Sequence, residues 1–341
     1  MLTVKKRKEA KAMNPFKALS PKEVAELLLS TERPLFVMHH RPDGDTVGST
    51  AALMHIALSL GKTPVGLCAD KIPERLAFLT EGLSVSTALP EPPFTPIAVD
   101  VASEPQLGSA ATLLKQNGVW FQAMIDHHSV GTPFADHLIT PDAAAAGEVV
   151  FSVAEVLMEN GHLPALPDAA ARALYAALSS DTGCFRYSNV TPKTMRTAAA
   201  LLDIPAVDAA DINHRLFEMK SKRQLRAEAF AIEHTDTTRD GKIAWVVITQ
   251  KDKLALGIEE EHLETAIDMV RSREGVDIAV AIRETPDGSF RASMRSNGFD
   301  VASVAAVFGG GGHMRAAGCS LSALSADEAL ESVLGEIKRQ L

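Results

Sequence analysis

The sequence predicts an α/β protein of two domains, the first with a doubly wound, mainly parallel sheet and the second a smaller α/β domain. In the first half of the chain, short apolar runs alternate with longer helical runs, which is the pattern of a parallel sheet with helices on both faces. The length of 341 residues indicates two domains, and a hydrophobic content of 46% is ample for sizeable cores.

The first domain is expected to alternate four strands with helices. Each expected strand is a short apolar run of the kind that is buried in a parallel sheet. The strands are expected at residues 34–40, 63–69, 95–102 and 119–128. The helices are expected at residues 46–60, 73–82, 106–118, 145–161 and 166–183, the first of them closed by Gly61.

From about residue 227 the pattern changes to that of a second α/β domain. Strands are expected at residues 242–249, 276–284 and 289–296, and helices at 259–273, 301–308 and 326–341. The Thr-Pro-Asp-Gly stretch before the third strand is a hairpin signal. The chain is therefore expected to consist of a basic, flexible tail (1–16), the first domain (17–202), a mostly helical connector (203–226) and the second domain (227–341).

Composition excludes several classes of protein. The formal net charge is -9, so there is no general basic surface for long nucleic acids. Cys68, Cys184 and Cys319 are far apart, which argues against a disulfide framework and fits a reducing cytosol. The basic N-terminus has no apolar run behind it and does not resemble a signal peptide. No apolar run approaches the roughly 20 residues that span a bilayer. We expect a cytoplasmic protein without membrane attachment.

Acidic and histidine side chains follow the apolar runs of four separate segments. Because the carboxyl ends of parallel strands meet at one edge of a sheet, we expect most of these side chains to converge there. The residues are His39, His40, Asp43, Asp45, Asp100, Asp126, His127, His128 and Asp181. A single aspartate in such a place is often only a helix cap, and Asp45 before its helix is a candidate for that role.

So many carboxylates in one place require positive charge. Unpaired carboxylates a few ångströms apart raise one another's pKa, and burial adds to this effect. Divalent cations remove the conflict. A mixture of aspartates and histidines favours Mn²⁺ or a similar ion, whereas a structural zinc site prefers thiolates. The number of ligands suits two ions about 3.5–4 Å apart.

Five stretches, in order, resemble the motifs of the DHH phosphoesterases. They are HHRPDGD, VDVASEPQLG, DHH, SSDTGCFRYSNVTPKT and FGGGGHMRAAGC, the last being similar to the DHH-associated C-terminal domain. The form of the fourth stretch and the two-domain layout resemble the branch of bifunctional oligoribonucleases (nano-RNases) and pAp phosphatases. The resemblance implies a metal-dependent phosphoric ester hydrolase that cuts short oligoribonucleotides to mononucleotides and removes the 3′-phosphate of pAp.

The resemblance also implies a role for each residue of the first domain. Two divalent cations, most simply Mn²⁺, would share Asp100. One ion would be held by His39, Asp43 and Asp100, and the other by Asp45, Asp100, His127 and Asp181. His128 would face the phosphate, and Asp126 would orient a histidine. Adjacent strand residues point to opposite faces, so His40, next to His39, is expected to be a packing or outer-shell residue. Hydrolysis by water is expected, without a covalent intermediate.

The second domain is expected to select the substrate across a cleft between the domains. Arg295 would bind phosphate, and the glycine run would offer free backbone amides to it. The substrate-binding residues are expected to be Arg295, Gly310, Gly311, Gly312 and His313. The expected substrates are short single-stranded RNA, dinucleotides and pAp.

Alternatives remain open. They are a cyclic or linear dinucleotide phosphodiesterase acting on c-di-AMP or pApA, a RecJ-like single-strand exonuclease, a pyrophosphatase, and a nucleotide-binding module without catalysis. The oligomeric state, a homodimer included, is not determined by the sequence. Gly131, Ala144 and Ala145 depart from the family pattern, which often has Asn at the first position and Ser at the other two.

Overall fold

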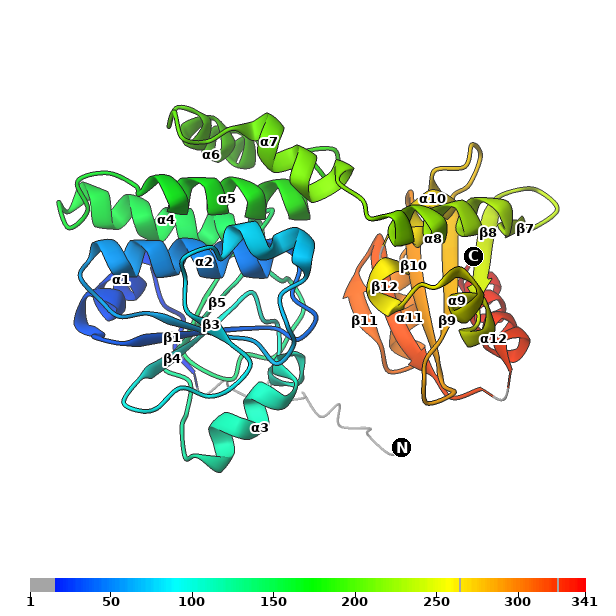
Figure 1. Cartoon of the computed structure of the whole chain (residues 1–341), viewed down its shortest axis with the longest axis horizontal. Coiled ribbons are helices and arrows are strands. Elements are labelled where there is room, and N and C mark those ends of the chain that lie inside the picture. The colour runs from blue at the N-terminus through cyan, green and yellow to red at the C-terminus, as the bar shows by residue number, and fades with distance from the viewer. Residues whose placement is uncertain (1–15, 264, 324) are drawn as a thin grey trace, which may run out of the picture. The chain divides into compact units, whose positions relative to one another are not determined.

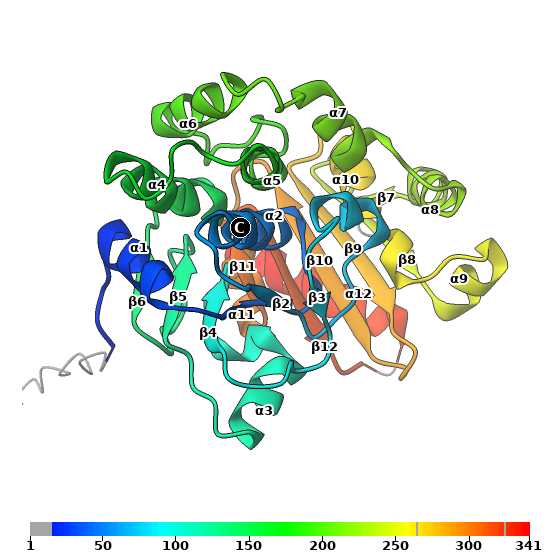
Figure 2. The same cartoon turned by 60° about the vertical axis from the view of Figure 1, so that its left-hand side comes forward.

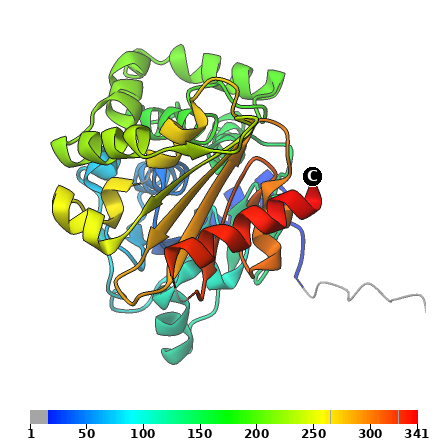
Figure 3. The same ribbon diagram turned by 90° about the vertical axis from the view of Figure 1, so that its right-hand side faces the viewer.

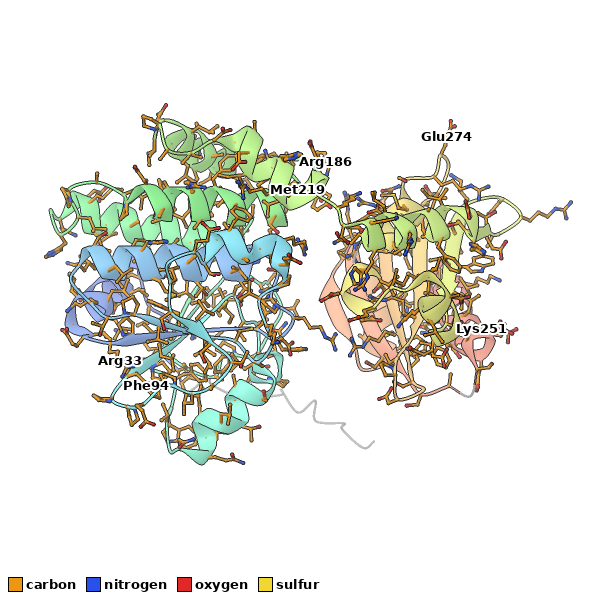
Figure 4. The ribbon with its side chains drawn as sticks, viewed as in Figure 1. Arg33, Phe94, Arg186, Met219, Lys251 and Glu274 are labelled. Atoms are coloured by element: carbon orange, nitrogen blue, oxygen red, sulfur yellow. The ribbon has the colours of Figure 1, made fainter. Side chains whose placement is uncertain are left out.

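A computed structural model describes residues 16–263, 265–323 and 325–341. These residues divide into two compact units, with the division between Met219, labelled in Figure 4, and Lys220. The expected connector, residues 203–226, is therefore shared between the units, and the domain bounds stay a prediction. The expected basic tail lies, except for Phe16, outside the described residues.

The first unit contains a six-stranded, wholly parallel sheet. The strand order is β3-β2-β1-β4-β5-β6, so the chain builds outward from β1 in one direction and then from β4 in the other. The doubly wound sheet is thereby confirmed, with two outer strands, β3 and β6, that the sequence pattern did not predict. The strands are β1 (Pro34–Met38), β2 (Val65–Leu67), β3 (Val85–Ser86), β4 (Thr95–Val99), β5 (Ala123–Asp126) and β6 (His137–Ile139).

Helices cover both faces of this sheet (Figure 1). On one face, side chains such as Phe36 and Ile97 pack against α1, α2, α4 and α5. On the other face, Leu35 and Ala98 pack against the segment that contains α3. The helices that cover the faces are α1 (Pro21–Ser30), α2 (Gly44–Ser59), α3 (Ser109–Gln116), α4 (Ala146–Glu159) and α5 (Asp168–Asp181).

Shorter helical segments complete the first unit. Two of them, α6 and α7, lie outside the layer formed by α4 and α5 (Figure 2). The short segments are the 3₁₀ turns η1 (Glu74–Leu79) and η2 (Glu104–Leu107), the helices α6 (Pro192–Leu202) and α7 (Ala209–Asn213), and the π-helical turn η3 (His214–Glu218).

Local chemistry fixes both ends of α2. The Asp43 carboxylate caps its first turn by accepting hydrogen bonds from the amides of Asp45 and Thr46, each at 3.1 Å. Asp43, and not Asp45, is therefore the N-cap residue of α2. Gly61, with φ of 75°, ends the helix as expected. Between these ends α2 packs along α5, where Gly48 allows close approach of the two backbones.

The second unit contains a mixed six-stranded sheet in the order β11-β12-β10-β9-β8-β7. Among its described strands, β8 and β9 pair in parallel and the other pairs are antiparallel. The predicted hairpin joins β9 and β10. The strands are β7 (Asp236–Thr237), β8 (Ile243–Ile248), β9 (Ile278–Glu284), β10 (Phe290–Ser296), β11 (Gly311–His313) and β12 (Ala316–Leu321). Neither β11 nor β12 was predicted, because glycine and alanine dominate them.

Helices also lie on both faces of the second sheet. On one face α11 and α12 cover a core that includes Val280 and Met294, and Figure 3 shows α12 crossing the strands. On the other face α8 and α10 cover Ala279 and Ala281. The helices are α8 (Lys222–Glu233), α9 (Gln250–Leu256), η4 (Glu260–Leu263), α10 (Ala266–Arg271), α11 (Val301–Val307) and α12 (Ala326–Gln340). Within the described residues, none of the helices combines the length and apolarity needed to cross a membrane.

The close contact between α2 and α5 generates a stability prediction. A methyl group on residue 48 would lie 2.6 Å from the Ala173 carbonyl oxygen, which is part of the α5 backbone and cannot easily move. Gly48→Ala should therefore destabilise the protein by about 1–3 kcal/mol despite the better helix propensity of alanine. Gly335→Ala, in α12 with open space around it, is the matched control and should stabilise by about 1 kcal/mol. Urea denaturation measures both, and equal shifts in the same direction would contradict the packing argument.

Candidate active site

The acidic and histidine residues of the first unit meet where the strand order reverses. β1 and β4 are neighbours at the centre of the sheet but lead the chain outward in opposite directions, and such a switch point is where open α/β sheets bind ligands. His39 follows β1 and Asp100 follows β4. The adjoining strand, β5, ends at Asp126 and is followed by His127.

The structure brings the six predicted ligands into two groups that meet at Asp100, and Asp100, His127 and His128 form a third, overlapping group. In the first group, His39 Nε2 lies 3.7 Å from Asp43 Oδ1 and 3.6 Å from Asp100 Oδ2. In the second, His127 Nε2 lies 3.7 Å from Asp45 Oδ2 and 3.3 Å from Asp181 Oδ2. The other oxygen of Asp100, Oδ1, lies 3.6 Å from His127 Nε2. Asp100 therefore presents one carboxylate oxygen to each group.

The donor atoms of these two groups fit divalent cations. Asp100 Oδ1 is buried and has no hydrogen-bond partner among the described residues, whereas buried polar atoms nearly always have one. Carboxylate oxygens combined with imidazole nitrogens suit Mn²⁺ and similar ions. Each group gathers its donor atoms within 4.8 Å of one another. The residues can thus hold two cations with Asp100 between them.

Backbone carbonyls orient the two histidines of these groups. His39 Nδ1 lies 2.8 Å from the His40 carbonyl oxygen, and His127 Nδ1 lies 3.2 Å from the Ala143 carbonyl oxygen. A ring nitrogen that faces a carbonyl must carry the proton, so in the neutral ring the lone pair is on Nε2, which faces the carboxylates. This arrangement of an outer hydrogen bond behind a ligating nitrogen is typical of metal-bound histidine.

Asp45 is completely buried, and the N-terminus of α4 satisfies its carboxylate. The Ala146 amide donates to Oδ2 at 2.6 Å and the Gly147 amide to Oδ1 at 3.0 Å, while the Ser49 hydroxyl donates to Oδ1 at 2.9 Å. Ala145, the N-cap residue of α4, has no side chain that could cap the helix. Asp45, in the first turn of α2, accepts the hydrogen bonds that an N-cap side chain of α4 would accept. The Ala146 and Gly147 amides are therefore satisfied although residue 145 is alanine and not serine.

Burial and mutual repulsion change the protonation of the site. Burial raises the pKa of Asp45 well above its usual range, and the charges of Asp100 and Asp43 raise it further. The pKa of Asp181 is raised by burial and by Asp45 in the same way. Burial lowers the pKa of His39, but its interactions with Asp100 and Asp43 outweigh burial and raise it well above its usual value. Bound divalent cations would oppose these shifts, because they favour the deprotonated form of each ligand.

Asp100 has a strained backbone at the centre of the site. Its φ is 59°, in the left-handed region, and its amide donates to the Ile125 carbonyl oxygen at 2.8 Å. This conformation costs roughly 1–2 kcal/mol for a residue with a side chain. Such strain persists where the surrounding structure imposes it and is concentrated at functional sites. Here it accompanies a side chain, only 3% exposed, that reaches both ligand groups.

His128 and Asp126 form a pair beside the ligand groups. His128 Nδ1 lies 2.7 Å from Asp126 Oδ1, and Asp126 is buried. Asp126 thus orients His128 rather than His127. His40 is held differently, since its Nδ1 and its amide both lie 2.7 Å from the Gln106 carbonyl oxygen. That arrangement agrees with the packing role predicted for His40.

Asn189 is a structural residue of the site that the sequence did not reveal. Its side-chain amide donates to the carbonyl oxygens of Ala144 and Asp181, each at 3.0 Å. It therefore ties the end of α5, which carries Asp181, to the segment that precedes α4. The available signal was its place in the fourth motif, eight residues after Asp181.

Packing explains the glycine at position 131. A Cβ atom there would lie 2.2 Å from the Ala102 carbonyl oxygen, and the Thr132 amide donates to that same oxygen at 2.9 Å. No side chain fits between these backbones, so in this protein the position cannot carry the asparagine that is often found in the family.

The glycine run of the second unit is only partly free to bind a ligand. The amides of Gly309 and Gly310 donate to the carbonyl oxygens of Ala306 and Ala305, at 3.0 and 2.9 Å, and this Schellman motif closes α11. The expectation of a free amide is therefore wrong for Gly310. Gly311 and Gly312 belong to the edge strand β11. The backbone of His313 lies in β11, but its side chain lies outside what the structure describes.

Arg295 lies on β10 and is half-buried. Its guanidinium donates to the Met294 carbonyl oxygen at 3.1 Å and has no ion pair within the described part of the chain. Its charge is thus available to an anion. The expected cleft between the domains stays a prediction, as does the placement of Arg295 opposite the ligand groups.

Comparisons with known proteins show the family of the chain. Residues 34–178 match the model of the DHH family N-terminal domain, and residues 239–340 match the DHHA1 domain. A bifunctional oligoribonuclease and PAP phosphatase NrnA of Thermus thermophilus is 30% identical over 323 residues, which is 93% of each chain. The chain belongs to the DHH family. The namesake of this relative in Bacillus subtilis is 27% identical to this DHH protein over 308 residues, 88% of this chain and 92% of the relative.

Solved structures establish the same fold. An exopolyphosphatase-related protein of Bacteroides fragilis superposes with a TM-score of 0.81 at 19% identity, covering 94% of this DHH protein and 95% of that chain. RecJ of Thermus thermophilus, in complex with Mn²⁺, gives a TM-score of 0.55 at 18% identity, covering 96% of this chain and 56% of RecJ.

The shared position of Asp100 generates a prediction on metal binding. Mn²⁺ should raise the melting temperature of the metal-free protein, because cations that bind only the folded state stabilise it and relieve the repulsion between carboxylates. In the Asp100→Asn variant, Mn²⁺ should raise the melting temperature much less, because the substitution removes negative charge from both ligand groups. Differential scanning calorimetry with and without Mn²⁺ measures the effect. An unchanged melting temperature of the original protein on adding Mn²⁺ would contradict the metal assignment.

The Asp126–His128 pair generates a prediction on pH. In the metal-free protein burial lowers the pKa of His128, but Asp126 and Asp100 outweigh burial and raise it to about 9. Because this exceeds the value of about 6.5 in the unfolded chain, the pair stabilises the fold below about pH 6.5 and loses this effect as the pH rises towards 9. Asp126→Asn should therefore lower the free energy of unfolding by up to about 3 kcal/mol just below pH 6.5, and by much less above pH 9. Urea denaturation in EDTA at these two pH values measures the loss, and an equal loss at both would contradict the prediction.

Proposed function

We propose that this DHH-family phosphoesterase hydrolyses short oligoribonucleotides to mononucleotides and removes the 3′-phosphate of pAp. The observation that carries the proposal is the pair of ligand groups that share Asp100 at the switch point of the sheet. The names of the relatives in Thermus thermophilus and Bacillus subtilis, which align over most of their length, support this substrate class.

We assign the two ligand groups to two divalent cations, with Mn²⁺ as the first choice. One cation would be held by His39, Asp43 and Asp100, and the other by Asp45, Asp100, His127 and Asp181. When bound, such ions lower the pKa of a water molecule and neutralise charge on the phosphate. The Mn²⁺ in the RecJ structure supports this choice.

The remaining polar residues act on the substrate in this proposal. His128, oriented by Asp126, donates a hydrogen bond from Nε2 to a phosphoryl oxygen and stabilises charge that develops there. Arg295 contributes a planar guanidinium that can contact a phosphate through two hydrogen bonds. The net charge of -9 disfavours long polyanions, so the proposal is restricted to short single strands. The three free cysteines support a reducing compartment, which we take to be the cytoplasm.

A substrate panel tests the proposed function. With Mn²⁺ present, pAp and di- to pentanucleotides should be hydrolysed with a far higher kcat/KM than long RNA, double-stranded DNA or c-di-AMP. EDTA should abolish turnover, and Asp100→Asn should lower kcat by at least roughly a hundredfold on every substrate. Release of mononucleotide and of inorganic phosphate is measured separately. A rate that rises steadily with RNA length would favour a RecJ-like exonuclease instead, and preferred hydrolysis of c-di-AMP would favour a cyclic dinucleotide phosphodiesterase.

A further inference from the structure

We infer that Arg291 binds a second phosphate of the substrate, one that is not hydrolysed, beside the phosphate held by Arg295. This inference rests on the proposed function, and it adds a residue that determines which substrates bind well. Side chains alternate along β10, so that Phe290, Ala292 and Met294 are buried in the core under α11 and α12. Arg291 and Arg295 therefore lie together on the opposite face.

On the β12 side, this face of the sheet is open next to the two arginines. Residues on β12 that lie directly across from β10 are small: Ser320 is opposite Arg291, and Ala316 is opposite Arg295. Both arginines are half-buried, and Ser320 is exposed. Neither guanidinium is covered by a large neighbour from β12, so a ligand can approach both.

Arg291 is unpaired among the residues that the structure describes. In this part of the chain its guanidinium forms no hydrogen bond and no ion pair. Arg295 donates to the adjacent Met294 carbonyl oxygen, at 3.1 Å. Two half-buried guanidiniums whose hydrogen-bonding capacity is almost unused form a site for an anion.

Glu260, the carboxylate that attracts Arg291, is shared with other cations. Arg283 is the direct cross-strand neighbour of Arg291 on β9. Glu260 is already engaged by Arg283 at 3.0 Å and by Lys253 at 2.8 Å. The neighbouring Glu284 carboxylate accepts a hydrogen bond from the backbone amide of Gln250 at 2.8 Å. The three cations Lys253, Arg283 and Arg291 thus share the single carboxylate of Glu260.

Folding alone does not account for an arginine at this position. Like charges directly opposite each other on two strands are destabilising, and Arg283 is fixed in place by Glu260 and by a hydrogen bond to Ser293 at 3.0 Å. The repulsion from Arg283 therefore opposes the attraction that Arg291 receives from Glu260. A phosphate anion would pair with Arg291 and reduce the repulsion from Arg283.

The spacing of the two arginines indicates the class of ligand. Residues i and i+4 on one strand face the same side and lie about 13 Å apart at the backbone, and long arginine side chains can converge from that distance. The pair therefore matches a small nucleotide with two separate phosphate groups better than a single inorganic phosphate. Both pAp and a dinucleotide with a 5′-phosphate, pApA, are such ligands.

The test compares substrates that differ in one phosphate that is not hydrolysed. pApA and ApA share the same scissile phosphodiester, but only pApA has a 5′-phosphate. Arg291→Gln should lower kcat/KM for pApA roughly tenfold to a hundredfold, the loss typical of a charge-assisted hydrogen bond, and should change the value for ApA less than about threefold. Arg291→Lys should restore part of the loss. Arg273→Gln, which removes an exposed arginine of the same unit before β9, is the matched control and should change neither value.

Thermal stability separates a binding role from a structural one. Because Arg291 faces Arg283, Arg291→Gln should leave the melting temperature unchanged or raise it while binding weakens. A lower melting temperature together with equal losses on pApA and ApA would overturn the inference, as would unchanged kinetics on both substrates.

A binding measurement distinguishes this inference from the proposed function. Isothermal titration of pApA and of ApA into the metal-free protein, in EDTA, reports binding without turnover. If pApA binds more tightly than ApA and Arg291→Gln removes the difference, Arg291 has the inferred role even if no substrate of the panel is hydrolysed. If the original protein hydrolyses pApA but shows no preference for it over ApA in either measurement, the inference fails and the proposed function stands.

Discussion

The burial of the Asp45 carboxylate is the constraint on which the site of the first unit depends. An unpaired charge inside a protein is very costly, so the side chain needs donors from several directions. The Ala146 and Gly147 amides and the Ser49 hydroxyl supply them. This requirement joins the first turn of α2 to the first turn of α4. The two helices thus hold Asp45 next to His127, which arrives from a different strand.

The other acidic residues of the site depend on this same arrangement. Four carboxylates from three segments are gathered around two imidazoles, and the resulting repulsion contributes to the raised pKa values of Asp45 and Asp181. Asp100 is held at their centre by a backbone conformation that is unfavourable in itself. Bound divalent cations would offset the repulsion between the carboxylates, and this is the physical link between the sheet topology and the phosphoesterase chemistry of the DHH family.

Sequence reasoning located the strands and the acidic residues because both depend on local patterns. Buried parallel strands are short apolar runs, and His39 and Asp100 directly follow two of them. Features that depend on distant contacts were missed. Asn189 looks like an ordinary loop residue until its two carbonyl partners are known, and Gly310 looks free until α11 is seen to end on its amide. Arg291 likewise resembles any solvated arginine until the strand register places it opposite Arg283.

The four glycines from Gly309 to Gly312 meet different demands. Gly309 has a φ of 72°, and a Cβ atom on Gly310 or Gly312 would collide with the β12 backbone. Gly311 has open space around it, and its φ is not positive. Substitution of any of the other three glycines should therefore disturb the fold. Gly311 is the one glycine of the run that neither packing nor backbone conformation requires.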